Sequence, residues 1–140
     1  MSRYLIYALI SMSFAGLTSV IAKTGIKNVS GDAGLAIRTV TVFIIIWLNT
    51  ILFQHTKDFK KFELHDIAFL ILSGITTSLS WIFYYKSIKL GEVSTVALID
   101  KGSILITLLL SYIILHEEIT LKTLLGGLFV IIGLLILSIK

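Results

Sequence analysis

Apolar residues in this chain gather into five long stretches, none of which contains a charged residue. The stretches cover residues 4–22, 39–56, 67–85, 102–116 and 123–139. Each approaches the roughly 20 residues that an α-helix needs to cross a bilayer, once its ends extend into the flanking segments. We therefore predict five transmembrane helices joined by short loops, over residues 3–22, 34–54, 66–86, 94–116 and 121–139.

A soluble helical bundle is the alternative to this fold class. Helices of a soluble bundle need a polar face at helical period, and these stretches contain too few strongly polar residues to form one. The composition agrees, since 56% of the residues are hydrophobic and 14% are charged, whereas about a quarter are charged in soluble domains. We therefore predict an all-α integral membrane protein of the cell membrane, with residues 1–140 forming a single transmembrane domain in contact with lipid.

The residue types argue against several classes of function. The chain has no cysteine, and its three histidines have no metal-binding spacing. Because no Ser–His pairing suggests a nucleophile, we expect neither an enzyme nor a metal or cofactor site. Nucleic-acid binding is not expected either, since the positive charges line the predicted membrane edges.

The loop over residues 55–65 is too short to fold on its own, and its lysines and phenylalanines predict a segment at the headgroup surface.

Lysine and arginine are divided evenly between the two ends of the predicted helices. The N-terminal side holds Arg3, Lys57, Lys60, Lys61 and Lys122, and the far side holds Lys23, Lys27, Lys86, Lys89 and Lys140. Membrane insertion follows the Lys/Arg asymmetry of short loops, which is almost absent here. We predict dual topology and an antiparallel homodimer. Two alternatives stay open, namely a fixed orientation held by a different partner subunit, or one set by the lysines of loop 55–65.

Ionisable residues are predicted to meet near the far-side ends of the helices. Arg38 lies within the second predicted helix, Asp100 and Lys101 lie within the fourth, and Lys23 ends the first. Charged residues inside a membrane normally face a cavity or a partner. Neighbouring residues point about 100° apart on a helix, so we do not expect Asp100 to pair with Lys101. We predict a polar vestibule that contacts solute; the alternative is that Asp100 neutralises Arg38 and fixes helix packing.

Small and hydroxyl residues continue from this cluster at helical spacing. The stripes comprise Asp100, Ser103, Thr107 and Ser111; Ser73, Thr77, Ser80 and Tyr84; Arg38, Thr41 and Asn49; and Ala15, Ser19 and Lys23. Such residues permit close helix packing and bond across helices, which is the alternative to a solute path. Because four stripes end at one charge cluster, we favour the path.

The fifth predicted helix is rich in glycine rather than in polar residues. Gly126, Gly127 and Gly133 predict a close-packing surface for another helix, which includes the same helix of a second copy. A lipid-facing helix with incidental glycines is the alternative. Thr120 precedes this helix and is expected to cap its first turn.

Several motifs resemble the EamA-type domain of the drug/metabolite transporter superfamily. The second half of the chain contains "KLGEVS", "LHEEIT" and "GGLFVIIG" in that order. The first half contains "GLTSVIAKTGIKNV" and "AIRTVTVFIIIW", which are similar to the start of small single-domain members. In those members an "IDK" segment stands where longer relatives usually place a proline. The resemblance covers essentially the whole chain.

This resemblance implies a fold and a set of residues. Full-length relatives are ten-helix carriers built from two inverted five-helix repeats, with substrate bound between them, and this chain would supply one repeat. The missing proline implies that Gly102 supplies any flexibility of the fourth helix. The resemblance singles out Lys23, Arg38, Trp81, Tyr84, Tyr85, Lys86, Gly91, Asp100, Lys101, Glu117, Gly126 and Gly133.

We predict a permease or exporter of a small polar metabolite. The charged residues predicted to lie within the membrane or at its edge, Lys23, Arg38, Asp100 and Lys101, carry a net positive charge, and the first helix has no acidic residue. We therefore expect an anionic or zwitterionic solute, such as an amino acid, an organic acid or a phosphorylated or lipid-linked metabolite. The candidate substrate-binding or coupling residues are Lys23, Arg38, Trp81, Tyr84, Tyr85, Asp100, Lys101 and Ser103. Alternatively, Asp100 couples protons. For the chain as a whole, the alternatives are an accessory subunit of another membrane complex or half of a heterodimeric carrier.

Overall fold

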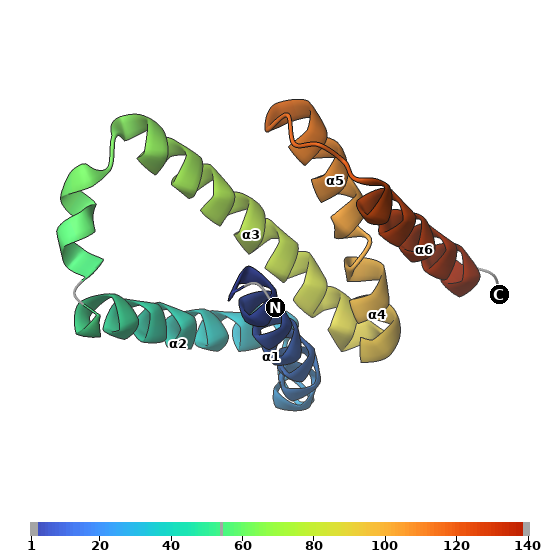
Figure 1. The fold of residues 1–140 in the computed structure, drawn as a ribbon. Coiled ribbons are helices and arrows are strands. Elements are labelled where there is room, and N and C mark those ends of the chain that lie inside the picture. Colours follow the sequence, from blue (N-terminus) through green and yellow to red (C-terminus); the bar gives the residue numbers. More distant parts are fainter. Residues whose placement is uncertain (1–2, 54, 139–140) are drawn as a thin grey trace. The chain divides into compact units, whose positions relative to one another are not determined.

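The computed structural model describes residues 3–53 and 55–138, and that part of the chain contains helices and no strands. The helices are α1 (Arg3–Gly25), α2 (Gly31–Leu52), the 3₁₀ helix η1 (His55–Lys61), α3 (Leu64–Leu90), α4 (Val93–Asp100), α5 (Ser103–Ile114) and α6 (Leu121–Ser138) (Figure 1). They fall into two compact units, Met1–Leu90 and Gly91–Lys140. The predicted all-α class is confirmed for the described residues.

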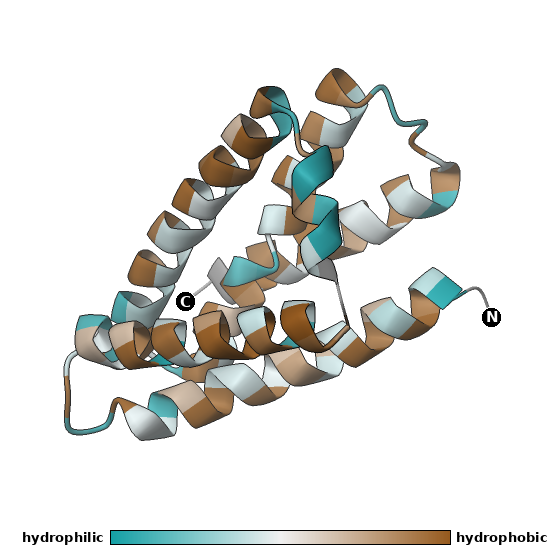
Figure 2. Ribbon diagram, turned by 90° about the vertical axis from the view of Figure 1, so that its left-hand side faces the viewer, coloured by the Kyte–Doolittle hydropathy of each residue, from teal (hydrophilic) through white to brown (hydrophobic). Residues whose placement is uncertain are grey.

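Among the described residues, four helical segments are long and apolar enough to cross a membrane. They are Arg3–Gly25, Gly31–Leu52, Leu64–Leu90 and Val93–Ile114, the last comprising α4 and α5 together. The fifth predicted span corresponds to the shorter apolar helix α6, so its crossing stays a prediction. Position 139 of that span and Lys140 of the charge balance lie outside the described residues. Hydrophobic residues cover the helices, and hydrophilic residues gather at helix ends and connections (Figure 2).

Few large apolar side chains are buried. The buried hydrophobic residues of the described part are Ile26, Leu35, Tyr85 and Ile88. By contrast, Leu52 and Leu90 are 74% and 90% exposed. Proteins in water rarely expose large contiguous apolar patches, so this surface fits lipid or another membrane helix as its surroundings.

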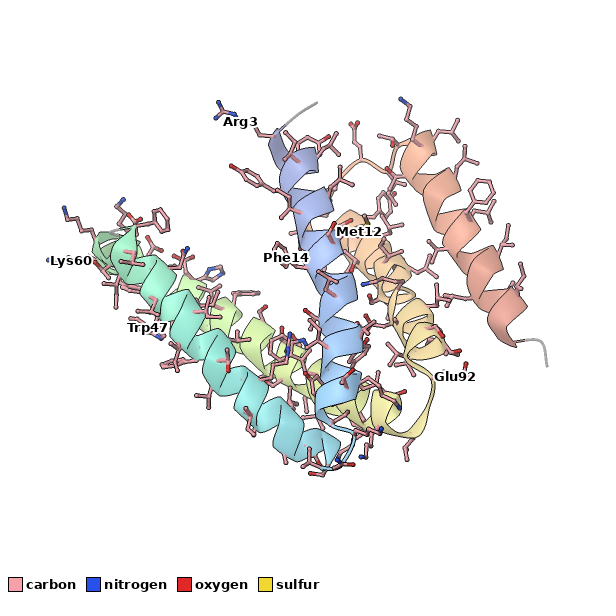
Figure 3. The ribbon with its side chains drawn as sticks, turned by 90° about the horizontal axis from the view of Figure 1, so that it is seen from below. Arg3, Met12, Phe14, Trp47, Lys60 and Glu92 are labelled. Carbon is pink, nitrogen blue, oxygen red and sulfur yellow. The ribbon has the colours of Figure 1, made fainter. Side chains whose placement is uncertain are left out.

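In the first unit, α2 and α3 are closest where α2 begins and α3 ends, and they diverge towards η1 (Figure 1). Ser30 caps α2, since its Oγ accepts a hydrogen bond from the Ala33 N–H at 3.1 Å. Gly31 permits the close approach, because a Cβ there would lie 2.9 Å from the Tyr85 carbonyl oxygen. Arg3 and Lys60 lie at the end of this unit away from the α1–α2 connection (Figure 3), which agrees with their predicted placement on one side.

The connection between α2 and α3 contains a short helix, η1, that the sequence did not predict. Phe59 packs this helix on α2, with its ring centroid 5.8 Å from that of Trp47, and a further contact of 6.2 Å joins it to Phe62. Lys61 donates a hydrogen bond to Asp58 at 2.6 Å. Aromatic contacts to α2 thus order a segment that is too short to fold alone, while its location at the headgroup surface stays a prediction.

In the second unit, the fourth predicted helix, over residues 94–116, corresponds to α4 and α5, which together form one candidate membrane span, Val93–Ile114. The helix is interrupted after Asp100, and α5 begins at Ser103. At the break the backbone bonds span three residues instead of four: the Gly102 N–H donates to Ile99 at 2.9 Å, and the Leu105 N–H donates to Gly102 at 3.0 Å. Such 3₁₀-type bonds inside a helical run often mark a hinge. The interruption occurs without a proline, at the glycine that the resemblance had indicated.

The start of α6 agrees with the sequence. The Thr123 N–H donates to Thr120 Oγ1 at 3.2 Å, which confirms Thr120 as the cap of its first turn. This bond satisfies one of the four N–H groups that lack a partner at the beginning of a helix.

Candidate functional site

Arg38 lies on α2, and its guanidinium contacts two aromatic rings of α3. The Arg38 Cζ lies 4.2 Å from the ring centroid of Trp81 and 6.0 Å from that of Tyr85. A cation over an aromatic face is attracted by the negative face of the ring. The Nη1 atom of Arg38 is buried and has no hydrogen-bond partner among the described residues. The structure therefore brings together three of the predicted site residues within the first unit.

Tyr84, a fourth predicted site residue, joins α3 to α1. Its hydroxyl bonds to Ser19 Oγ at 2.7 Å. Other hydroxyls of the predicted stripes bond to their own helix, as Thr77 does to the Ser73 carbonyl at 2.8 Å and Thr107 to the Ser103 carbonyl at 3.1 Å. Local bonds of this kind satisfy a hydroxyl without a partner helix. Tyr84 differs from these residues, because its bond joins two helices.

Lys23 and Lys89 bind the carbonyl ends of each other's helices. The ammonium of Lys23, on α1, donates to the carbonyls of Ile88 and Lys89 at the end of α3. In return, the ammonium of Lys89 donates to the Ile26 and Lys27 carbonyls, just after α1, at 2.7 and 2.9 Å. The last carbonyls of a helix lack partners and carry a partial negative charge. This pair thus ties α1 to α3.

The role of Lys89 was missed by sequence reasoning. The predicted third helix ends at residue 86, whereas α3 continues to Leu90, which places Lys89 in its last turn. A lysine in the last turn of a helix is a known signal for carbonyl capping. Lys23 was predicted to contact substrate, and in this state its ammonium is engaged by backbone carbonyls. Its role towards substrate stays a prediction.

Two grooves of the first unit are lined by predicted site residues, one by Arg38 and Tyr85 and the other by Trp81. The groove between α1 and α2 has a volume of about 460 Å³ and is lined by Thr18, Ile21, Ala22, Gly25, Ile26, Val29, Gly34, Ile37, Arg38 and Tyr85. The groove between α2 and α3 has a volume of about 630 Å³ and includes Asp32, Thr39, Ser78 and Trp81. Asp32 also lies 3.8 Å from the ammonium of Lys86. Both volumes are in the range of small-molecule sites.

Asp100, Lys101 and Ser103 lie together at the break between α4 and α5. The ammonium of Lys101 lies 3.9 Å from a carboxylate oxygen of Asp100, so the expectation that these neighbours do not pair is wrong. The angle of about 100° between neighbours applies to a regular helix, and the helix ends at Asp100. Arg38 belongs to the first unit, so a contact between Asp100 and Arg38 stays a prediction.

The three glycines of α6 have different surroundings. Gly127 packs on α5, because a Cβ there would lie 3.2 Å from Leu108 Cδ1. A Cβ at Gly126 or Gly133 would meet no described atom within 4 Å, and these two glycines share a face of the helix. Gly133 also lines a groove of about 460 Å³ with Lys101. Gly127 therefore packs within the chain, while Gly126 and Gly133 stay candidates for contact with a second copy.

Residues 2–139 match the profile of the EamA-like transporter family. The chain belongs to this family. A curated relative from Sinorhizobium sp, described as "Uncharacterized transporter in cobO 3'region", is 33% identical over 133 residues, which cover 95% of this chain and 94% of the relative. No solved structure matches significantly.

The family match confirms the resemblance seen in the motifs, since it extends over nearly the whole chain. Together with the apolar helices, it makes this EamA-like transporter a multi-pass membrane protein. A family of transporters also agrees with the prediction of a non-enzyme. Among the described residues, no cluster of three or more His, Cys, Asp or Glu side chains is placed to hold a metal ion.

Proposed function

We propose that this EamA-like transporter moves a small anionic or zwitterionic metabolite across the cell membrane, as an antiparallel homodimer. The family and the description of the relative support transport in general. The sign of the substrate rests on one observation, which is the buried and unpartnered Nη1 of Arg38. A buried donor without a partner is costly, and more so on a charged group. A bound anion would remove that cost.

The antiparallel homodimer is supported by three features of the chain. First, α6 has 18 residues and is therefore about 27 Å long, which is close to the ~30 Å hydrocarbon core. A crossing by α6 makes five spans, the size of one repeat of an inverted-repeat carrier. Second, lysine and arginine are balanced between the two sides. Third, Gly126 and Gly133 present an open face to a partner helix.

The candidate residues then divide into distinct roles. Arg38 binds the anionic group of the solute, and Trp81 and Tyr85 position its guanidinium. Asp100 and Lys101, at the break between α4 and α5, are the charged residues that the second unit contributes to the proposed substrate site. Broken helices commonly form the substrate and ion sites of secondary transporters.

The experiment uses the protein purified alone and reconstituted into liposomes. Counterflow is measured with labelled glutamate, leucine and choline as anionic, zwitterionic and cationic probes. We expect carriage of glutamate or leucine and none of choline. Arg38→Ala and Lys101→Ala should each lower the rate at least about tenfold, the equivalent of one good charged hydrogen bond. Lys122→Arg, outside the proposed site and without effect on the charge balance of the two sides, is the control.

Two results would contradict the proposal. Full transport of the anionic or zwitterionic probe in both Arg38→Ala and Lys101→Ala would refute the argument from charge. A protein that carries no probe alone, but copurifies with another membrane protein and tolerates substitution of Arg38 and Asp100, would support the accessory-subunit alternative.

A further inference from the structure

The groove between α1 and α2 combines one charged residue with apolar surroundings. Among its described lining residues, Arg38 is the charged one. The hydroxyl of Thr18, which also lines it, already donates to the Phe14 carbonyl at 2.8 Å. The remainder of the lining consists of aliphatic residues, glycines and Tyr85. This groove therefore offers a ligand one positive charge and a mostly apolar wall.

Arg38 lies against an aromatic ring and keeps one donor atom without a partner. Its guanidinium carbon lies 4.2 Å from the centroid of the Trp81 ring, a distance at which a cation is attracted to the ring. This contact provides no hydrogen-bond acceptor, and Nη1 of Arg38 has none among the described residues. A planar edge with parallel N–H donors matches the two oxygens of a carboxylate.

The neighbouring lysines are committed to other groups. Lys23 and Lys89 donate to backbone carbonyls, and Lys86 lies 3.8 Å from Asp32. A ligand with a single negative charge is therefore balanced by Arg38. A dianion would leave one charge uncompensated in an apolar setting, which is unfavourable.

We infer that Arg38, Trp81 and Tyr85 form a site for the carboxylate of a small amphiphilic monocarboxylate, whose apolar part lies in the groove between α1 and α2. The inference rests on the proposed function, because it narrows the anionic or zwitterionic solute to one chemical class. The groove volume of about 460 Å³ suits a small organic molecule.

The test measures binding through the fluorescence of Trp81. The chain has two tryptophans, and Trp47, which contacts Phe43 and Phe59, is replaced in a Trp47→Phe background. The purified protein in detergent is titrated with hexanoate, with its neutral analogue hexanamide, and with the dianions adipate and hexyl phosphate. We expect saturable changes with hexanoate, and at least about tenfold weaker binding of the other three, the range for loss of a charge-assisted hydrogen bond.

Arg38→Lys separates the carboxylate site from a purely structural role. Lysine keeps the positive charge but loses the planar pair of donors, so hexanoate should bind at least about tenfold more weakly. Arg3→Lys is the matched control, since Arg3 lies at the outer end of α1 (Figure 3), and it should bind hexanoate as the parent does. A drop in thermal stability of Arg38→Lys with unchanged hexanoate affinity would overturn the inference.

Other outcomes are equally decisive. Equal affinity for hexanoate and hexanamide would overturn the site. Specific binding of hexanoate without its transport in liposomes would support the site and count against the proposed transport. Transport of another anion at an unchanged rate in Arg38→Lys would overturn the site and leave the proposed transport standing.

Discussion

The lysine pair between α1 and α3 shows how backbone carbonyls accommodate charged side chains at helix ends. The ammoniums of Lys23 and Lys89 each meet backbone carbonyls at the end of the other helix. A carbonyl that ends a helix must otherwise find water or another donor. These bonds therefore stabilise both helix ends at once, and they hold α1 beside α3.

Lys89→Met is expected to lower the free energy of unfolding by about 1.5–3 kcal/mol, the range for a hydrogen bond to a charged group. Its two bonds of 2.7 and 2.9 Å to the Ile26 and Lys27 carbonyls are lost. Lys23→Met should cost a similar amount. Unfolding in mixed detergent micelles measures the change, with the exposed Lys27→Met as control. If Lys23→Met abolishes transport at unchanged stability, Lys23 contacts substrate instead.

At this scale, the sequence predicted which residues gather but not what each one binds. Counting residues from the helix ends placed Arg38 and Tyr85 at one depth, the family resemblance singled out Trp81, and the structure brings the three together. The partners of Lys23 are main-chain oxygens, and every residue offers such an oxygen, so no sequence pattern identifies them. The contact between Asp100 and Lys101 depends on a break that the hydrophobic pattern does not record.

At the scale of helices, the approach of α2 to α3 depends on a glycine. Gly31 begins α2, and a Cβ there would lie 2.9 Å from the carbonyl oxygen and 3.1 Å from the carbonyl carbon of Tyr85. Both atoms belong to the backbone of α3, so no side-chain rotation relieves the contact. The same approach sets the position of Arg38, two turns further along α2, against the rings of α3.

Gly31→Ala is therefore expected to destabilise the protein by about 1–3 kcal/mol, as overpacking usually does. It should also weaken hexanoate binding, because α2 must move away from α3. Gly74→Ala is the matched control, since a Cβ at Gly74 would meet nothing within 4 Å and alanine favours a helix interior. Unfolding in detergent and the Trp81 titration measure both effects. Equal stability of Gly31→Ala and Gly74→Ala would show that α2 and α3 do not approach each other as closely as in this structure.

The extents of the helices were largely predictable, because a run without charges identifies a membrane span. The interruption of the fourth was not, since it involves backbone bonds at Lys101–Gly102 rather than a change in hydrophobicity. Proline is the usual sequence signal for such a break, and this chain has none. The ordering of η1 by Phe59 and Trp47 was equally hidden, because it depends on a contact with α2.

For the whole molecule, we expect a small number of lysines to decide the orientation. The sequence places five lysines or arginines on each side of five predicted spans. Lys61 is one of these cations, and its hydrogen bond to Asp58, and then the charge of that carboxylate, raise the pKa of Lys61 above its usual value. It therefore stays charged at physiological pH. A balance this close is expected to be tipped by changing a few residues.

We predict that one-sided reporters fused separately to the two termini detect both orientations in comparable amounts for the unaltered chain. Replacing Lys57, Lys60 and Lys61 by glutamine leaves two cations on the N-terminal side against five. The cation-rich side stays in the cytoplasm, so the N-terminus should then lie outside and the C-terminus inside. Lys27→Gln with Lys86→Gln leaves three on the far side against five and should give the opposite orientation.

The two altered chains should transport poorly when each is produced alone and should regain transport when they are produced together, because only the pair supplies both inverted repeats. A single orientation of the unaltered chain, unmoved by either set of substitutions, would refute the antiparallel homodimer and leave a different partner subunit to supply the second repeat.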